Sequence, residues 1–271
     1  MLKYDCCMIT DVGRVRTNNE DNFYFNGNYK RAVEQHKYEK QDLIYKGGVF
    51  AVCDGMGGEE FGEKASLYAV ETLNKYKDDN FSQYISRYIE EANDKICSMI
   101  ELNNGVRSGT TLALVDITDG KAISCNIGDS RVYLYRKGKL MQLSEDHTRT
   151  AQMVKAGILT EEQAAAHRDR HVLTQHLGIF AHELCIEPYI AETVDIMVDD
   201  IFLLCSDGLT DMLTDMEIEQ ILSLKHPASQ LAGLLVSSAL EKGGKDNVTV
   251  GVIKTVGRKN NLFKKIFWGV K

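Results

Sequence analysis

The stretch VFAVCDGMGG, Val49–Gly58, decides the fold. Its first four residues are apolar, and a run of this length and composition is typical of a buried β-strand. The run stops at Asp54, after which the glycines allow the backbone to turn sharply and to approach a ligand closely. The Asp54 carboxylate and the Gly55 carbonyl are hard oxygen donors of the kind that Mg²⁺ and Mn²⁺ prefer. An acid–glycine step after a strand is more often a plain turn, so a metal site needs further support.

That support comes from the same arrangement elsewhere in the chain. The apolar run Ile201–Cys205 leads to Asp207-Gly208, Asp246 precedes the last apolar run, and Asp129 lies in the turn of a short hairpin. Four carboxylates gathered at the ends of strands would repel one another strongly unless cations compensated them.

The charge count suits two divalent cations that share one carboxylate. Such a pair generates hydroxide near neutral pH and holds the oxygens of a phosphoryl group during in-line displacement. Arg16 then has a role, because its planar guanidinium can bind a phosphate with two hydrogen bonds.

Composition describes an ordinary globular chain. Of 271 residues, 44% are hydrophobic and 26% charged, which argues against disorder, and the net charge of −7 argues against a nucleic-acid-binding protein. The seven cysteines form no Cys-x-x-Cys pair, so we expect them to be reduced and buried. The sequence begins without a signal peptide and contains no run of membrane-spanning length, which favours the cytoplasm.

The remaining pattern predicts one domain of mixed α and β structure. Hydrophobic residues at helical spacing predict amphipathic helices, and apolar runs between turn signals predict an antiparallel meander. Residues 26–48 are polar and predict an exposed loop or hairpin, and the polar section Asp146–Gly178 contains a capping box at Thr160. The predicted helices are 63–77, 81–102, 215–224 and 228–242; the predicted strands are 110–117, 122–127, 131–136, 140–143, 190–198, 201–205 and 248–255.

Six short motifs in order resemble those of the PPM family of metal-dependent protein serine/threonine phosphatases, in its bacterial form. Together they span roughly residues 5–255. The motifs are Arg16-x-x-x-Glu20-Asp21, Asp54-Gly55-x-Gly57-Gly58, Gly109-Thr110-Thr111, Gly128-Asp129-Ser130-Arg131, Ser206-Asp207-Gly208 and Asp246-Asn247.

The resemblance implies an α+β fold, a four-layer α-β-β-α sandwich with two antiparallel sheets between helices. Its phosphatase domain would cover residues 1–256, with residues 146–178 as a flap subdomain beside the active site, and 257–271 would form a basic amphipathic tail. A site for two Mn²⁺ or Mg²⁺ ions, with a third ion as an option, would lie at one end of the sandwich.

The resemblance also implies a role for each site residue. Asp54 would bridge both metal ions, the Gly55 carbonyl would bind one of them, and Asp207 and Asp246 would hold the other. Glu20 and Asp21 would act through metal-bound water. Asp129, with Asp211 nearby, would bind a third ion, and Arg16 would hold the phosphate.

The implied reaction is hydrolysis of phosphoserine and phosphothreonine in proteins by a hydroxide that bridges the two metal ions. Its partners would be phosphorylated proteins and a cognate kinase, with no nucleic acid, and we expect a monomer. Three departures from the family pattern stand out, and one of them is Arg168, which occupies a position in the flap segment where related bacterial sequences usually have proline. Met56 replaces the histidine that animal members carry after Asp-Gly, so another group must supply the leaving-group proton, and the 26–48 excursion is longer than usual.

Other interpretations remain open at this level. Cys125 to Arg131 fits C-x-x-G-x-x-R, the pattern of a cysteine phosphatase, although Asp129 lies inside the would-be anion site. The chain could also be a phosphatase-like binding module, or a phosphatase dedicated to one regulator of a sigma-factor pathway.

Two further segments allow weaker hypotheses. His167, His171 and His176 lack an acid or cysteine at ligand spacing, so we expect no zinc site there. The basic tail carries Phe263, Phe267 and Trp268 and predicts at most a weak contact with a membrane surface.

Overall fold

Two large antiparallel sheets form the centre of the protein in a computed structural model that describes residues 2–32, 35–57, 61–76 and 81–257. In sheet I the strands lie in the order β11 (Lys139–Gln142), β10 (Arg131–Arg136), β14 (Ile201–Cys205), β15 (Val248–Val256), β1 (Lys3–Asp11) and β4 (Lys37–Ile44). In sheet II the order is β12 (Tyr189–Ile190), β9 (Lys121–Ile127), β8 (Leu112–Thr118), β5 (Gly48–Cys53), β2 (Asn22–Phe25) and β3 (Asn28–Tyr29), and β13 (Val194–Asp195) also pairs with β9. A separate ribbon joins β6 (Gly55–Gly57) to β7 (Ser108–Thr110).

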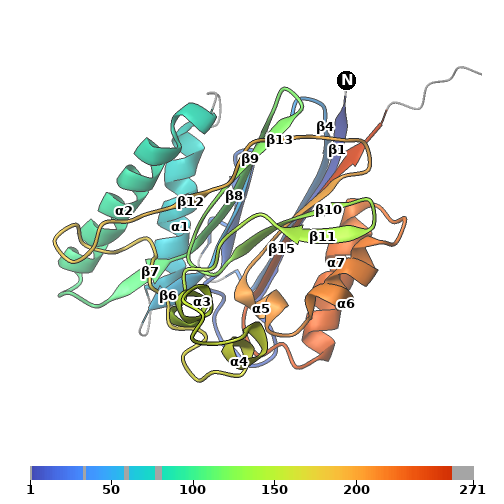
Figure 1. Cartoon of the computed structure of the whole chain (residues 1–271). Helices are drawn as coiled ribbons and strands as arrows, with labels where there is room; N and C mark the ends of the chain where they lie inside the picture. Colours follow the sequence, from blue (N-terminus) through green and yellow to red (C-terminus); the bar gives the residue numbers. More distant parts are fainter. Residues whose placement is uncertain (1, 33–34, 58–60, 77–80, 258–271) are drawn as a thin grey trace, which may run out of the picture.

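Helices cover the outer faces of both sheets, which confirms the predicted α-β-β-α sandwich (Figure 1). Sheet II is covered by α1 (Gly62–Leu73) and α2 (Ile85–Leu102). The 3₁₀ turn Asn74–Tyr76 follows α1, and the 3₁₀ turn Phe81–Gln83 precedes α2. Sheet I is covered by α5 (Asp207–Thr210), α6 (Asp215–Leu222) and α7 (Ala228–Glu241). The two short helices α3 (Arg149–Lys155) and α4 (Glu161–Ala165) lie together at one end of the sandwich (Figure 1).

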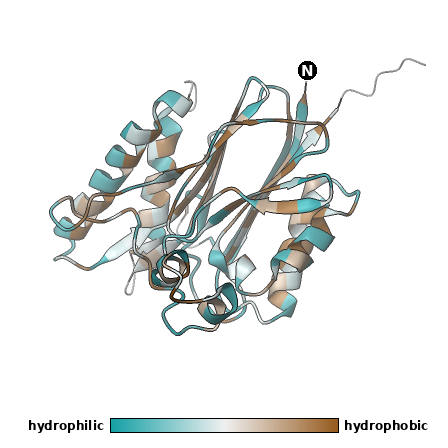
Figure 2. Cartoon of the chain, in the orientation of Figure 1, coloured by the Kyte–Doolittle hydropathy of each residue, from teal (hydrophilic) through white to brown (hydrophobic). Residues whose placement is uncertain are grey.

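Strand β5 shows why the sequence folds in four layers. Successive side chains of a strand point to opposite faces, and both faces of β5 are buried. Phe50 and Val52 join the hydrophobic cluster between the two sheets, whereas Ala51 and Cys53 join the cluster under α1 and α2. A strand covered on both sides must be apolar throughout, and the central strands are accordingly hydrophobic in Figure 2.

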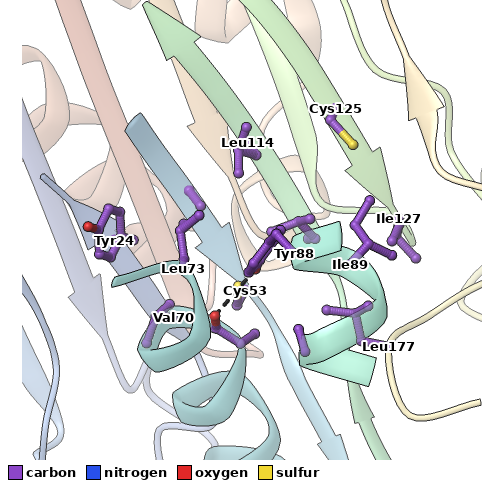
Figure 3. Close-up of a cluster of buried hydrophobic side chains, with 14 of the residues drawn as sticks. Tyr24, Cys53, Val70, Leu73, Tyr88, Ile89, Leu114, Cys125, Ile127 and Leu177 are labelled. Atoms are coloured by element: carbon purple, nitrogen blue, oxygen red, sulfur yellow. Dashed lines mark hydrogen bonds between the residues drawn. The ribbon is translucent and has the colours of Figure 1, made fainter. Parts of the chain in front are cut away.

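The cluster under α1 and α2 includes Tyr88 and Cys125 among aliphatic side chains (Figure 3). Tyr88 is fully buried, and its hydroxyl donates a hydrogen bond to the Ala69 carbonyl at 3.3 Å. This bond satisfies the polar end of a large core residue and ties α2 to α1.

The predicted meander is wrong at one place, because β9 and β10 lie in different sheets. The turn after β9 carries the chain from sheet II to sheet I. Gly128 has a φ of +94°, and Val132 and Leu134 of β10 then pack between the sheets. A turn signal between two apolar runs predicts a reversal, and it does not determine which sheet receives the second strand.

Two other segments differ from expectation. Residues 26–48 form more than the expected exposed loop or hairpin, because they add strands to both sheets. Strand β3 extends sheet II, and β4 pairs with β1 over eight residue pairs, from Tyr4–Ile44 to Asp11–Lys37. The predicted strand 190–198 consists of the two short strands β12 and β13, because pairing with β9 stops between them. The predicted tail lies outside the described residues except for Gly257, and no described helix has the length and apolarity to cross a membrane.

Candidate functional site

Acidic residues from both sheets meet at the end of the sandwich where α3 and α4 lie. Asp54 follows β5 of sheet II, Asp207 follows β14 and Asp246 precedes β15 in sheet I, and Asp129 lies in the turn that crosses between the sheets. These four acids, with others, line one open pocket of about 560 Å³. The pocket is lined by Arg16, Glu20, Asp54, Gly55, Met56, Gly57, Thr111, Asp129, Arg170, His171, Leu173, Asp207, Asp211, Lys245 and Asp246.

Hydrogen bonds between Thr110 and Thr111 and the backbone of Asp54 hold this residue in place. The amide of Asp54 donates to Thr111 Oγ1 at 2.9 Å, and its carbonyl accepts from the Thr111 amide and from Thr110 Oγ1, both at 2.9 Å. Gly55 must be glycine, because a Cβ there would lie 2.1 Å from the Gly62 carbonyl oxygen. The predicted Asp54–Gly55 pair is therefore built rigidly into the wall of the pocket.

Two carboxylate oxygens at the site are buried without a hydrogen-bond partner among the described residues. They are Asp207 Oδ1 and Asp21 Oδ1. The other oxygen of Asp21, Oδ2, accepts hydrogen bonds from Ser206 Oγ at 2.8 Å and Thr249 Oγ1 at 2.6 Å. An unpartnered buried carboxylate oxygen is costly, and a cation or its bound water would satisfy it. The residues present therefore fit a metal centre.

Burial, and then mutual repulsion, raises the pKa values of the clustered acids. Burial, followed by the charges of neighbouring aspartates, raises the pKa of Asp54 well above its usual value. Burial and then the charges of Asp207 and Asp146 raise the pKa of Asp129 to about 8. Burial is also the main reason that the pKa of Glu20 rises to about 7 and that of Asp21 to about 6. Divalent cations would remove the cost of keeping these groups ionised.

Arg16 lines the same pocket and contacts one of its acids. Its guanidinium donates a 2.7 Å hydrogen bond to Asp246 Oδ2, which raises the pKa of Arg16 further, and about half of its side chain is exposed. Asn247 fixes the loop that carries Arg16: its side chain donates to the carbonyls of Val12 and Asn18 and accepts from the Glu20 amide. The sequence motif contains Asn247, and the structure adds this positioning role.

His171 and Arg170, from the section 146–178 that the resemblance predicts as a flap, also line the pocket and were not predicted as site residues. His171 lies 3.4 Å from Asp207 Oδ2 through Nδ1 and 3.4 Å from Asp211 Oδ2 through Nε2, and Arg170 also contacts Asp211 at 3.4 Å. Ligand atoms of Asp129, His171 and Asp207 all lie within 4.8 Å of one another. Sequence spacing did not reveal the acids beside His171, because Asp129 and Asp207 are distant from it in the sequence.

Cys125 lies away from this pocket. It is 1% exposed in the cluster under α1 and α2 (Figure 3), and burial raises the pKa of its thiol to about 12. A neutral, buried thiol cannot act as a nucleophile toward a protein substrate. The cysteine-phosphatase pattern is therefore coincidental.

Met56, the residue that stands in place of the histidine of animal members, does line the pocket, and its side chain cannot donate a proton.

Comparisons with known proteins agree with this geometry. The sequence model described as "Protein phosphatase 2C" matches residues 36–230. The chain is 32% identical to "Serine/threonine phosphatase stp" of Listeria innocua, an alignment that covers 94% of this chain and 96% of the relative. It is 34% identical to "Protein phosphatase PhpP" of Streptococcus pneumoniae, with 91% and 95% covered.

The solved structures that resemble this chain are also serine/threonine phosphatases. The serine/threonine phosphatase PstP/Ppp of Mycobacterium tuberculosis superposes with a TM-score of 0.80 at 29% identity, covering 94% of this chain and all of that one. The catalytic domain of PstP in complex with two manganese ions superposes with a TM-score of 0.78 at 29% identity, covering 95% of this chain and all of that one.

Proposed function

The chain belongs to the protein phosphatase 2C family, and from this premise we propose how its own residues perform the reaction. The protein is a serine/threonine phosphatase that depends on Mn²⁺ or Mg²⁺ and acts on phosphorylated proteins. The observation that carries the assignment of residues is the meeting of Asp54, Asp129, Asp207 and Asp246 in one pocket.

Asp54, the Gly55 carbonyl, Asp207 and Asp246 would hold two divalent cations. When bound, these ions supply Lewis acidity that activates water and neutralises charge on the phosphate. Asp207 Oδ1 is buried and unpartnered among the described residues, so a cation there would satisfy it. Glu20 and Asp21 would hold water bound to the ions, and Asp129 with Asp211 would form a third, more open position.

Arg16 would bind the phosphate of the substrate. Its guanidinium stays positively charged beside Asp246 and lies at the pocket rim with about half of its side chain exposed. The planar fork suits two hydrogen bonds to phosphate oxygens. Met56 cannot protonate the leaving serine or threonine oxygen, so that proton comes from water or another group.

The domain is proposed to cover residues 1–256, with 146–178 as a flap beside the pocket, as its residues Arg170 and His171 support. A cytoplasmic location is consistent with seven free cysteines, six of them buried. A kinase that phosphorylates the same proteins and a monomeric state are further parts of this proposal.

The test is hydrolysis of a phosphothreonine peptide with EDTA and then with Mn²⁺ restored, repeated with Asp207→Asn and Cys125→Ser. EDTA should abolish the activity and Mn²⁺ should restore it. Asp207→Asn should lower kcat/KM by more than about 100-fold, because it removes a metal ligand. Cys125→Ser should retain activity once its thermal unfolding shows a folded protein. Activity that resists EDTA and is lost with Cys125→Ser would contradict the proposal.

A further inference from the structure

Lys30 is a buried lysine behind the acidic pocket. It is 2% exposed, and its Nζ donates a hydrogen bond to the Asn19 carbonyl at 2.5 Å. The β2–β3 hairpin brings it there: the turn at Asn26 and Gly27 has φ values of 44° and 89°, and Lys30 follows the last hairpin pair, Tyr24–Tyr29. A lysine is rarely fully buried unless a partner compensates its charge.

The surrounding hydrogen bonds fix Lys30 relative to the Arg16–Asp21 loop. The Asn22 side chain donates to the Lys30 carbonyl at 2.9 Å and accepts from the Lys30 amide at 3.0 Å. The Asn19 carbonyl accepts the hydrogen bond from the Lys30 ammonium, and Asn19 Oδ1 accepts another from the Asp21 amide. Lys30 therefore contacts the same loop that carries Glu20 and Asp21.

Three acids act on the charge of Lys30, and one of them, Glu20, lines the pocket. Asp21, Glu63 and Glu20 all act to raise its pKa, while burial, which is the larger effect, lowers that pKa to about 8. The ammonium is thus charged at neutral pH. Glu63 is itself buried, at 6% exposed, so this positive charge faces acids that water screens poorly.

We propose that Lys30 is an internal counter-ion of the acidic pocket, whose fixed positive charge weakens the binding of divalent cations there. It partly compensates the acids in the metal-free protein and repels the ions that would bind. The inference rests on the metal centre described above. It gives a role to the 26–48 segment, which delivers Lys30 to the back of the site.

A structural role for Lys30 predicts the opposite result. If the lysine only positions the Arg16–Asp21 loop, its replacement would displace Glu20 and Asp21 and weaken metal binding. If it acts through its charge, its replacement by a residue of similar length makes the pocket more negative and strengthens metal binding.

The test is isothermal titration of Mn²⁺ into the metal-free protein, with Lys30→Met compared to Lys46→Met. Lys46 is an exposed lysine of the same segment. It precedes the first residue of β5, Gly48, whereas Asp54 follows the last, so Lys46→Met controls for the loss of one charge remote from the pocket. Lys30→Met should lower the Kd for Mn²⁺ roughly three- to tenfold, as expected for removal of a nearby positive charge. Lys46→Met should leave the Kd unchanged.

A second pair of variants separates charge from folding. Glu63→Gln removes an acid that faces Lys30, so Lys30→Met/Glu63→Gln should return the Kd toward that of the unaltered protein. If Lys30→Met alone does not fold, comparison of the double variant with Glu63→Gln still measures the effect of Lys30. An equal or higher Kd on loss of Lys30 would overturn the inference, whereas an unaltered protein that binds no Mn²⁺ would instead overturn the metal centre.

Discussion

Asp129 illustrates how the acids of the site act on stability when no cation is bound. Its pKa in the folded protein is about 8, that of Glu20 is about 7 and that of Asp21 about 6, all above their usual values. Between about pH 4 and pH 8 the folded protein therefore holds protons that the unfolded chain has released. These groups contribute stability at the acidic end of this window, and the contribution is lost as the pH rises.

Replacement of Asp129 by Asn should remove part of this loss of folding stability at high pH. In EDTA, urea unfolding should show Asp129→Asn more stable than the unaltered protein at pH 8, by about 1–3 kcal/mol after allowance for solvent screening. At pH 5, where Asp129 is protonated in the folded state and only the unfolded chain has released the proton, the difference should be clearly smaller. The exposed acid Asp94 of α2 provides the control, since Asp94→Asn should show no such pH dependence. An advantage of Asp129→Asn that is equal at both pH values would contradict this account.

At the scale of single residues, the sequence predicted that the acids would lie together and missed some of the residues beside them. Asp54, Asp129, Asp207 and Asp246 all line the pocket, because short motifs at strand ends specify where such side chains go. His171 and Lys30 were missed as parts of the site. Their roles depend on contacts between segments far apart in the chain, such as His171 with Asp207, and no local pattern encodes those.

Among the elements, the turn after β9 matters to the site because it moves the chain between sheets and carries Asp129. Gly128 has a φ of +94°, and a Cβ there would lie 2.7 Å from Thr111 Cγ2. Thr111 in turn hydrogen-bonds the Asp54 amide and, at 2.6 Å, the Ser130 hydroxyl. A side chain at Gly128 would therefore disturb Asp54 and Asp129 together.

Gly138 offers a matched control for this turn. It has a φ of +81° in the β10–β11 turn, and a Cβ there would meet no atom within 4 Å. Gly138→Ala should cost only the strain of a positive φ, about 1 kcal/mol in urea unfolding, and leave kcat unchanged. Gly128→Ala should cost more and should also lower kcat and the affinity for Mn²⁺. Equal effects of the two substitutions would show that the turn does not position the site.

Elements with a strong local pattern were predictable, and their assignment to sheets was less so. The strand 201–205 and the capping box at Thr160 occur as predicted, because apolar runs and capping residues act locally. The sheet change at Gly128 and the pairing of β4 with β1 depend on which strand is available as a neighbour. Such pairing is a property of the tertiary structure, which single-strand patterns do not contain.

In the whole molecule, the two sheets and the site depend on each other. The cluster between the sheets fixes sheet I against sheet II, and the acids that would share metal ions come from both, Asp54 from one and Asp207 and Asp246 from the other. Cations bound there would link the two halves of the sandwich. The central claim is therefore a spatial one: divalent cations bind between these three carboxylates.

Crystals grown with Mn²⁺ and measured at the manganese absorption edge test this claim most directly. Anomalous difference maps should show two manganese peaks between Asp54, Asp207 and Asp246, and Asp207→Asn should remove at least one of them. Manganese bound only beside His171 and Asp129, or absent from the pocket of a protein that hydrolyses phosphothreonine in the same buffer, would contradict the account.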